Sequence, residues 1–570
     1  MAAASNNIAA DTDLWIFRDG RRDVSGPAMV RDLSRRISQG SSRSLMDSLI
    51  QSGDLEAALG DADSPSAGAA SELTDALAYS VCTGNVNQDL AQLVSRIAAP
   101  DSISVSPPEG FTYYALHPLD FARLAARVPA EPIPCAVIGI RSIGTTLSAM
   151  TAASLKTAGR SATRITVRPT GHPYARITEF TPEQSRWIGD QVSASAQFLI
   201  VDEGPGRSGS TFLSVAEALL QAGVPREIIT ILGSRQFDPE SLCARDAAER
   251  WRGFRYLSST PSVNTRCEKC LYIGGGDWRK HLCGEEEDEE NWPESWTQME
   301  RLKFLSPERQ TFFKFEGMGP FGAEVRERAF ALGHAGFSPQ VSDPGDGFLA
   351  YTTLNGRRLR RDDLTAALLE RVARYCAFRI SNFACEASQP DELRKMLEFN
   401  IHQEFGLDLK MDHHGLLCLQ PVLADGRMQP YEWIATGPDE FLKTDAISHG
   451  DNHFFPGPCD IAWDLAGTAI EWQLSSDAIG FLLSRFRRLS GVNPSPRLRH
   501  YMLAYSVFRL GFCKMAMSTV SGSTEEHRLQ TAYFYYRSQA ERILEGSTLL
   551  QPSQSISARH CPAALRALQD

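Results

Sequence analysis

The stretch that decides the fold is Phe198-Leu199-Ile200-Val201-Asp202-Glu203-Gly204-Pro205-Gly206-Arg207-Ser208-Gly209-Ser210-Thr211. Four apolar residues predict a short buried strand, and two adjacent carboxylates follow where that strand ends. Glycines and hydroxyl side chains then lead into a helix expected over 212–222. Unpaired N–H groups and the macrodipole at such a helix start favour an anion, so we expect a phosphate there. The two acids would then hold sugar hydroxyls or, through water, a magnesium ion.

Further apolar strands and helices are expected on both sides of this stretch. Apolar strands are expected at 135–138, 164–167 and 228–232, and a helix is expected at 145–157. Short apolar strands that alternate with longer helices predict βαβ units and a parallel sheet, with the chemistry in loops at the carboxyl ends of the strands. The fold class expected for this region is therefore α/β.

Residues 202–210 resemble the phosphoribosyl diphosphate (PRPP) signature of type I phosphoribosyltransferases, in which an acidic pair precedes a loop of Thr and Gly residues. The resemblance implies that Asp202 and Glu203 grip the 2- and 3-hydroxyls of the ribose. The loop residues that would wrap the 5-phosphate are Gly206, Arg207, Ser208, Gly209 and Ser210. The loop departs from the family pattern at its first three positions, where the family has two threonines and a glycine. A strand-to-helix turn that needs its glycines only for geometry is the alternative.

Two further loops are similar to parts of the same family. Gly139-Ile140-Arg141-Ser142-Ile143-Gly144 is placed like the pyrophosphate loop, which implies binding by Ser142 and Gly144. Arg168-Pro169-Thr170-Gly171-His172-Pro173-Tyr174-Ala175-Arg176 looks like the mobile loop that closes over the reacting centre. The implied reaction is displacement at the anomeric carbon of PRPP, with Mg²⁺ and cationic side chains stabilising the departing pyrophosphate. The expected catalytic cations are Arg141 and one of Arg168 or Arg176.

A second group of candidate site residues begins at Lys314, which lies in the apolar strand TFFKF. Glu324 and Glu327 follow on an expected helix, and the segment 348–356 resembles the hinge strand of aminoglycoside-phosphotransferase-like kinases. The resemblance implies an α+β, two-lobed kinase-like module that binds ATP. Lys314 would hold the α and β phosphates and pair with Glu327 or Glu324.

The catalytic loop of this module has two registrations. In the preferred one, Asp425 orients the hydroxyl nucleophile, and Glu432 and Asp445 hold magnesium. The competing one uses His449-Gly450-Asp451 as the start of the catalytic loop and leaves Asp460 or Asp464 as the metal ligand. Asp464-Leu465-Ala466 favours the first registration because it matches a structural Asp-Leu-Ala of the family. Neither registration is complete, so a degenerate kinase fold is the alternative to an active one.

Two other motifs carry weaker signals. Gly317-Met318-Gly319-Pro320-Phe321-Gly322 spells GxGxxG between a strand and a helix, which is typical of dinucleotide sites only inside a βαβ unit. Cys267, Cys270, His281 and Cys283 would suffice for a tetrahedral zinc site, but the His-x-Cys spacing is cramped. Free cysteines used as small apolar residues are the alternative.

Composition limits the class of protein. With 570 residues, of which 42% are hydrophobic, the chain can bury a core and is too long for one ordinary domain. A formal net charge of −11 argues against nucleic acid as a partner. Twelve scattered cysteines, no signal-peptide pattern and no long apolar stretch predict a cytoplasmic protein without a membrane partner. The composition is compatible with an oligomer.

Five regions are expected along the chain. They are an irregular, mainly helical region at 1–105, a phosphoribosyltransferase-like domain at 106–260, a linker at 261–305, a kinase-like module at 306–545 and a tail at 546–570. The predicted function is PRPP-dependent phosphoribosyl transfer to an unidentified small-molecule acceptor, fused to a kinase-like module that uses ATP. A non-catalytic sensor of PRPP or a nucleotide is the alternative.

Overall fold

The computed structural model describes residues 14–545, except 17–19, 87, 130–132, 262–268, 284–287, 386–389, 410–414, 451–453 and 455–456. These residues form two compact units. The first unit holds the described parts of Phe17–Leu359 and Tyr431–His453, and the second holds those of Ala9–Ile16, Arg360–Pro430 and Phe454–Asp570. None of the described helices combines the length and the apolar composition that crossing a membrane requires.

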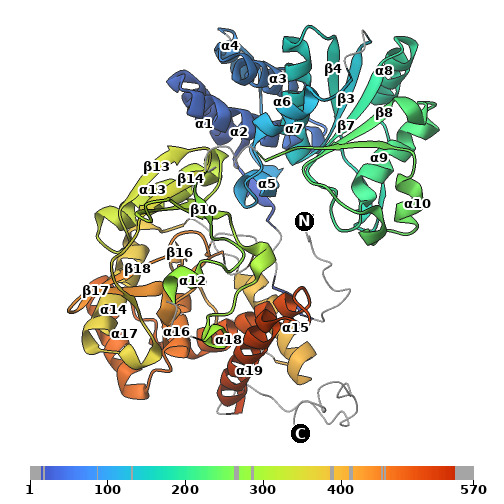
Figure 1. Ribbon diagram of the computed structural model, residues 1–570. Coiled ribbons are helices and arrows are strands. Elements are labelled where there is room, and N and C mark those ends of the chain that lie inside the picture. The colour runs from blue at the N-terminus through green and yellow to red at the C-terminus, as the bar shows by residue number, and fades with distance from the viewer. Residues whose placement is uncertain are drawn as a thin grey trace. The chain divides into compact units, whose positions relative to one another are not determined.

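A five-stranded parallel sheet forms where the sequence predicts βαβ units (Figure 1). Its order is β4-β3-β7-β8-β9, so β3 and β7 are neighbours although β4 lies between them in the chain. At such a reversal of strand order, the loops at the carboxyl ends separate and leave a crevice for a ligand. The strands are β3 (Cys135–Ile140), β4 (Ala162–Val167), β7 (Gln197–Val201), β8 (Ile229–Gly233) and β9 (Arg255–Ser258).

Alternate residues of the central strands point into two different cores. Val137 and Leu199 belong to the core that contains α7, whereas Ile138 and Ile200 belong to the core that contains α9. Successive side chains of a strand point to opposite faces, so both faces of this sheet are buried, which explains the uninterrupted apolar runs. The helices of this region are α7 (Ile143–Thr157), α8 (Pro182–Ser193), α9 (Ser210–Gln221) and α10 (Ala247–Trp251).

The N-terminal helices share a core with the parallel sheet. Leu49 of α2 and Leu73 of α3 pack in the same cluster as Leu147 of α7, so the core continues across the boundary expected at 105. The hydroxyls of Ser25 and Ser41 cap the first two helices by accepting backbone N–H groups. The elements are β1 (Arg22–Val24), α1 (Gly26–Gln39), α2 (Ser42–Asp61), α3 (Ala67–Thr83), α4 (Leu90–Ser95), β2 (Ile103–Val105), α5 (Glu109–Thr112) and α6 (Pro118–Ala125).

A second sheet of the first unit is antiparallel, in the order β10-β11-β12-β14-β13. Two of its strands come from 261–305, so this segment is not the linker that the sequence suggests. The GxGxxG turn follows β12 of this antiparallel sheet and therefore does not lie in a βαβ unit. A Cβ atom on Gly322 would lie 2.0 Å from the carbonyl oxygen of Gly317, so glycine serves a tight turn there. The elements are β10 (Leu271–Tyr272), α12 (Arg279–Leu282), β11 (Lys303–Leu305), β12 (Thr311–Phe315), α13 (Gly319–His334), β13 (Val341–Gly345) and β14 (Phe348–Thr352).

A three-stranded antiparallel sheet completes the first unit, with β15 (Arg357–Arg358), β17 (Trp433–Gly437) and β18 (Glu440–Lys443). The second unit is mainly helical, as the pattern after residue 477 predicts. Its elements are α14 (Ala366–Asn382), α15 (Pro390–Phe405), β16 (Pro421–Leu423), β19 (Pro458–Asp460), α16 (Ala462–Glu471), α17 (Ser476–Ser490), α18 (Ser495–Met517) and α19 (Thr524–Glu545). The tail expected at 546–570 lies outside the described residues.

Candidate functional site

The acidic pair lies at the carboxyl end of β7, beside the loop that follows β3. A Cβ atom on Gly144 would lie 3.0 Å from Asp202 Oδ1 and 2.7 Å from the Val201 carbonyl oxygen. Only glycine permits so close an approach. The structure thus brings together the two loops that the sequence assigns to one site, at the point where the strand order reverses.

The loop after β3 contains a strained residue. Ser142 has φ 94° and ψ −123°, which L-residues rarely adopt. Holding a non-glycine residue there costs on the order of 1–3 kcal/mol. Strain of this kind collects at ligand-binding loops, so the conformation of Ser142 supports the binding role predicted for this loop.

The predicted phosphate loop contacts the predicted mobile loop. The mobile loop forms a hairpin of β5 (Thr170–His172) and β6 (Ala175–Ile177), with Pro173 at its tip. The hydroxyls of Ser208 and Ser210 both donate to the Pro173 carbonyl oxygen, at 2.9 and 2.5 Å. Of the other loop residues, Gly209 has φ 68° and directly precedes α9, Gly206 is half-buried and Arg207 is exposed.

The three predicted catalytic arginines lie near one another. Arg141 Nη1 is 3.2 Å from Asp61 Oδ1, and Arg168 Nε is 3.0 Å from Asp61 Oδ2. Arg168 Nη1 also donates to the Arg141 carbonyl oxygen at 2.8 Å. Arg176 donates to the Gly171 carbonyl oxygen at 2.6 Å, and burial together with the nearby Arg168 lowers its pKa. Asp61, from α2, is a partner that the sequence analysis missed.

Carboxylates at this edge of the sheet are poorly solvated. Burial raises the pKa of Asp202 well above its ordinary value, and the neighbouring Glu203 adds to this effect. Burial also raises the pKa of Glu203. Glu109 of α5 joins the group because burial, and then Glu203, raise its pKa to about 7. Clusters of such groups are typical of ligand sites. The sequence analysis missed Glu109, whose only local signal is its position before the aromatic run 111–114.

Glu109→Gln is expected to weaken the dependence of stability on pH. The pKa of Glu109 lies above the ordinary 4.5 in the folded state, so folding stabilises the protonated carboxyl. That contribution is complete below pH 4.5 and is lost as the pH rises through about 7. The free energy of unfolding of wild type should therefore fall relative to that of the variant by about 1–3 kcal/mol between these pH values. Urea unfolding at pH 4.5 and 7.5 measures this, and an equal difference at both values contradicts it. Glu179→Gln, at an exposed position, is the control.

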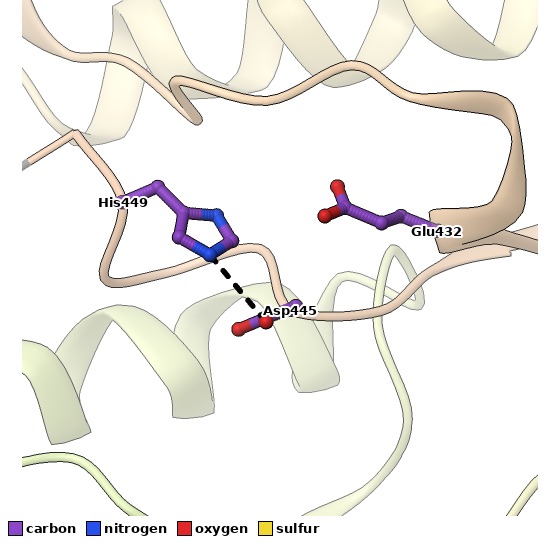
Figure 2. A group of neighbouring side chains, drawn as sticks. All are labelled: Glu432, Asp445 and His449. Carbon is purple, nitrogen blue, oxygen red and sulfur yellow. Dashed lines mark ion pairs between the residues drawn. The ribbon is translucent and has the colours of Figure 1, made fainter. Parts of the chain in front are cut away.

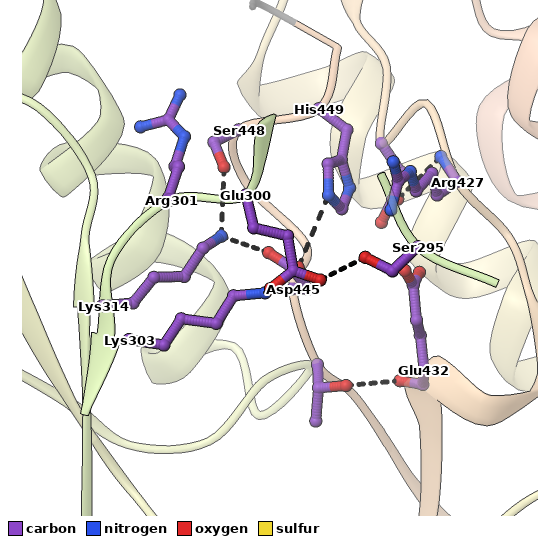
Figure 3. A network of polar contacts seen from close by, with 12 residues as sticks. Ser295, Glu300, Arg301, Lys303, Lys314, Arg427, Glu432, Asp445, Ser448 and His449 are labelled. Carbon is purple, nitrogen blue, oxygen red and sulfur yellow. Dashed lines mark hydrogen bonds and ion pairs between the residues drawn. The ribbon is translucent and has the colours of Figure 1, made fainter. Parts of the chain in front are cut away.

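The second predicted site lies on the antiparallel sheet (Figure 3). Lys314 is buried on β12, and its Nζ atom contacts the Asp445 carboxylate, Glu316 Oε1 at 3.0 Å and Ser448 Oγ at 3.2 Å. Although burial acts in the opposite direction, the charges of Asp445 and Glu316 raise the pKa of Lys314. The ammonium group therefore stays charged inside the protein. The structure brings Lys314 and Asp445 together as the sequence analysis expects of one site.

The two predicted metal ligands also meet, and a third group joins them (Figure 2). Glu432, Asp445 and His449 each offer a ligand atom, and these atoms lie within 4.8 Å of one another. Glu432 Oε2 is 2.7 Å from Lys443 Nζ, and His449 Nε2 is 3.4 Å from Asp445 Oδ2. Against the effect of burial, Lys314 and then His449 hold the pKa of Asp445 well below its ordinary value. Two carboxylates fit Mg²⁺, and an imidazole would suit Mn²⁺ or Zn²⁺ as well.

Lys303 and Glu300 extend this site, and the sequence analysis missed both. Lys303 of β11 lies directly opposite Lys314 in the strand ladder. Glu300 Oε2 lies 3.3 Å from Lys303 Nζ (Figure 3). Glu300 Oε1 accepts from Trp278 Nε1 at 2.8 Å. These residues fall in the expected linker, where only the alternation of charged and apolar residues over 301–304 indicates a strand.

The predicted pairing of Lys314 with the helix after its strand does not form. Glu324 and Glu327 are exposed on α13. Lys314 pairs instead with Asp445 and with Glu316. Glu316 lies two residues further along and is within reach because residues i and i+2 of an extended segment share one face. The assignment of Glu327 to ATP binding is therefore wrong.

Asp425, in the second unit, is enclosed in a buried network. Its carboxylate accepts from the Tyr375 hydroxyl and from the Arg427 backbone N–H, and the residue has no exposed surface. The Asp464 carboxylate accepts the backbone N–H groups of Asp425 and Gly426, at 2.8 and 3.1 Å. A carboxylate held in this way does not reach a substrate hydroxyl, so the catalytic role expected of Asp425 is wrong. The Asp425 and Asp464 carboxylates accept backbone N–H groups of residues 425–427.

The remaining predicted ligands are the cysteines of the zinc hypothesis and Asp451 of the competing registration. Cys267 lies outside the described residues, as does Asp451 of the competing registration. Cys270 and Cys283 are both half-buried. Over the parts of 14–545 that the structure describes, the one group with metal-ligand spacing is Glu432, Asp445 and His449. The zinc reading of the cysteines stays a prediction.

Comparison with known proteins finds no matching family model and no matching curated protein. Among solved structures, the choline kinase LicA from Streptococcus pneumoniae is 13% identical with a TM-score of 0.29, over 42% of this chain and 89% of its own. The macrolide 2'-phosphotransferase MphH from Brachybacterium faecium is 14% identical with a TM-score of 0.29, over 41% and 88%. A mutant of the aminoglycoside phosphotransferase APH(4)-Ia, in complex with ADP and hygromycin B, is 11% identical with a TM-score of 0.28, over 50% and 97%. Each of these matches covers half of this chain or less.

Proposed function

We propose that the site on the antiparallel sheet binds a magnesium–nucleoside triphosphate and transfers its terminal phosphoryl group to a hydroxyl of a small molecule. The observation that carries this proposal is the contact between buried Lys314 and Asp445, beside Glu432. In the transfer, the bond between the γ-phosphorus and the β-phosphate oxygen breaks. A bond to the acceptor oxygen forms, and the hydroxyl proton leaves to solvent. Phosphoryl transfer relies mainly on positioning and on charge stabilisation, which cations and a metal supply.

The charge pattern of the strands favours a phosphate ligand. Lys303 and Lys314 are both buried and lie directly opposite each other, an arrangement that destabilises a strand pair unless an anion lies between the charges. In the protein as it stands, three carboxylates already offset these two charges: Glu300, Glu316 and Asp445. Mg²⁺ would be held by Glu432 and Asp445, and its charge would compensate Asp445 and leave the Lys314 ammonium group available to a nucleotide phosphate.

Calorimetric titration with a non-hydrolysable ATP analogue tests this function. Binding is expected in the presence of Mg²⁺ and should weaken at least about tenfold when the metal is chelated, because the bridging charge is lost. A titration of ADP under the same conditions shows whether the terminal phosphate contributes. Binding of equal strength with and without the metal, or no binding in either case, contradicts the proposal.

A second function is favoured by a different observation, the approach of Asp202 to Gly144 where the strand order reverses. We propose that this edge of the parallel sheet binds Mg²⁺–PRPP and transfers its phosphoribosyl group. Asp202 and Glu203 would hold the ribose hydroxyls, and the loop 206–210 would hold the 5-phosphate. Arg141 and Arg168 would hold the pyrophosphate.

The transfer breaks the bond between the anomeric carbon and the pyrophosphate oxygen, and the electron pair leaves with pyrophosphate. An acceptor atom forms the new bond to that carbon and gives up its proton. Glu109 lies beside Glu203 and has a pKa of about 7, so it is suited to take this proton. The charge on the leaving group is stabilised by the arginines and the metal.

Release of pyrophosphate from PRPP, in the presence of a pooled metabolite extract, separates an enzyme from a sensor. Calorimetric binding of PRPP together with release supports transfer. Binding without release supports the alternative of a non-catalytic sensor, and neither binding nor release contradicts a PRPP site.

A further inference from the structure

The end of α2 occupies the cluster of arginines. The carboxylate of Asp61, the last residue of α2, accepts hydrogen bonds from Arg168 Nη2 and Nε at 2.5 and 3.0 Å. It also accepts one from Arg141 Nη1 at 3.2 Å. Arg141 Nη1 also donates to the Gly60 carbonyl oxygen at 2.8 Å. The C-terminus of a helix carries the negative end of the macrodipole. One carboxylate and one helix end therefore neutralise two arginines that the sequence analysis expects to meet pyrophosphate.

The approach of α2 is built into its sequence. A Cβ atom on Gly53 would lie 2.0 Å from Thr146 Oγ1 of α7, and one on Gly60 would lie 2.9 Å from Arg141 Cζ. Glycine at position 53 therefore permits the close packing of α2 on α7, and at position 60 the neighbour is the end of the Arg141 side chain. The contact with the arginines is thus a consequence of how α2 packs on the loop after β3 and on α7.

The contact remains accessible from solvent. The side chain of Asp61 is 36% exposed, and those of Arg141 and Arg168 are 17% and 30% exposed. Salt bridges at such exposure contribute little stability, so an anion of higher charge can replace the carboxylate. Arginine binds phosphate oxygens with the same bidentate geometry as it binds a carboxylate.

The serine hydroxyls of the phosphate loop are occupied in a similar way. Ser208 and Ser210 donate to the Pro173 carbonyl oxygen, an acceptor that a phosphate oxygen would replace. Groups of the protein itself therefore occupy both ends of the proposed ligand position.

We propose that Asp61 competes with pyrophosphate, and with the pyrophosphate group of PRPP, for Arg141 and Arg168. The Asp61 carboxylate forms ion pairs with Arg141 and Arg168 in the unliganded protein, and the ligand displaces it. This inference rests on the proposed PRPP site. It explains why an N-terminal helix, outside the sheet that carries the loops, ends on the arginines, and it makes α2 a regulator of ligand affinity.

Titration with inorganic pyrophosphate, on the full chain, tests the inference. Asp61→Asn keeps the size of the side chain and removes its charge, so it is expected to tighten pyrophosphate binding by roughly 3- to 10-fold. Adding Arg168→Gln to Asp61→Asn should remove the gain. Asp63→Asn is the matched control, because it removes the same charge from an exposed residue two positions later and should leave the affinity unchanged.

The outcomes separate this inference from the proposed function. Equal or weaker binding by Asp61→Asn, with pyrophosphate still bound by wild type, overturns the competitor role and leaves the PRPP site intact. An equal gain in Asp63→Asn also overturns it, because the effect is then one of net charge. If neither wild type nor Asp61→Asn binds pyrophosphate or PRPP, the proposed site itself is wrong.

Discussion

Replacing Lys314 by methionine is expected to abolish nucleotide binding and to destabilise the first unit. Methionine fills nearly the same space but leaves the Asp445 and Glu316 carboxylates without their shared cation. Removing one partner of a buried ion pair costs about 3–5 kcal/mol, because the other charge stays buried. The measurements are calorimetry with the ATP analogue and Mg²⁺, and urea unfolding.

A double variant distinguishes loss of binding from loss of folding. Lys314→Met combined with Asp445→Asn removes both charges, so it should be more stable than Lys314→Met alone while binding remains absent. Lys395→Met, at an exposed position of α15, is the control and should preserve both stability and binding. Nucleotide binding that survives in Lys314→Met contradicts the assignment of Lys314 to the phosphates.

The combined change Asp202→Asn and Glu203→Gln is expected to abolish PRPP-dependent release of pyrophosphate while it stabilises the protein. The amides keep the shape of the side chains but lose the charge that binds the ribose hydroxyls. Hydrogen bonds to charged groups contribute about 1.5–3 kcal/mol each, so two lost contacts correspond to a loss of roughly 100-fold or more in turnover at low substrate.

The gain in stability follows from the direction of the pKa shifts. Burial raises the pKa of both carboxyls, so each favours folding most in its protonated form, and this contribution is lost as the pH rises. At pH 7 the neutral amides remove that cost, and the midpoint of thermal unfolding should rise. Side chains whose replacement stabilises the fold are commonly found at functional sites.

Two exposed acidic residues provide the control for the Asp202/Glu203 double variant. Asp190→Asn combined with Glu179→Gln makes the same change of charge at exposed positions and should alter neither property. Full release of pyrophosphate by the Asp202/Glu203 variant contradicts the ribose contact. A fall in the unfolding midpoint contradicts the electrostatic description of the acidic pair.

The parts of the fold that the sequence predicts well are those encoded by neighbouring residues. The run 198–201 is apolar because its strand is buried on both faces, and the glycines and serines after it precede α9 as expected. The loops with Gly144 and Asp202 could be placed at one edge because parallel strands present their carboxyl ends together. The expected pairing of Glu432 with Asp445 has a different source, the resemblance of this segment to aminoglycoside-phosphotransferase-like kinases, and each residue is adjacent to a short strand.

Partners that are distant in the chain leave no such local trace. Charged residues at 301 and 303 look like a polar linker until β11 pairs with β12 and sets Lys303 opposite Lys314. Asp425 looks catalytic beside Gly426 until Tyr375 and the backbone around it enclose its carboxylate. Burial and pairing depend on contacts between segments, which periodicity does not report.

The amino-acid order by itself thus determined the βαβ region and the acidic pair with the glycine- and serine-rich loop that follows it. It did so because strands, glycine turns and helix starts are properties of a few consecutive residues. Only the tertiary structure decided which charge meets which: Lys314 with Asp445 and Glu316, and Arg141 and Arg168 with Asp61. Coulombic contacts between segments far apart in the chain exist only once the cores have packed.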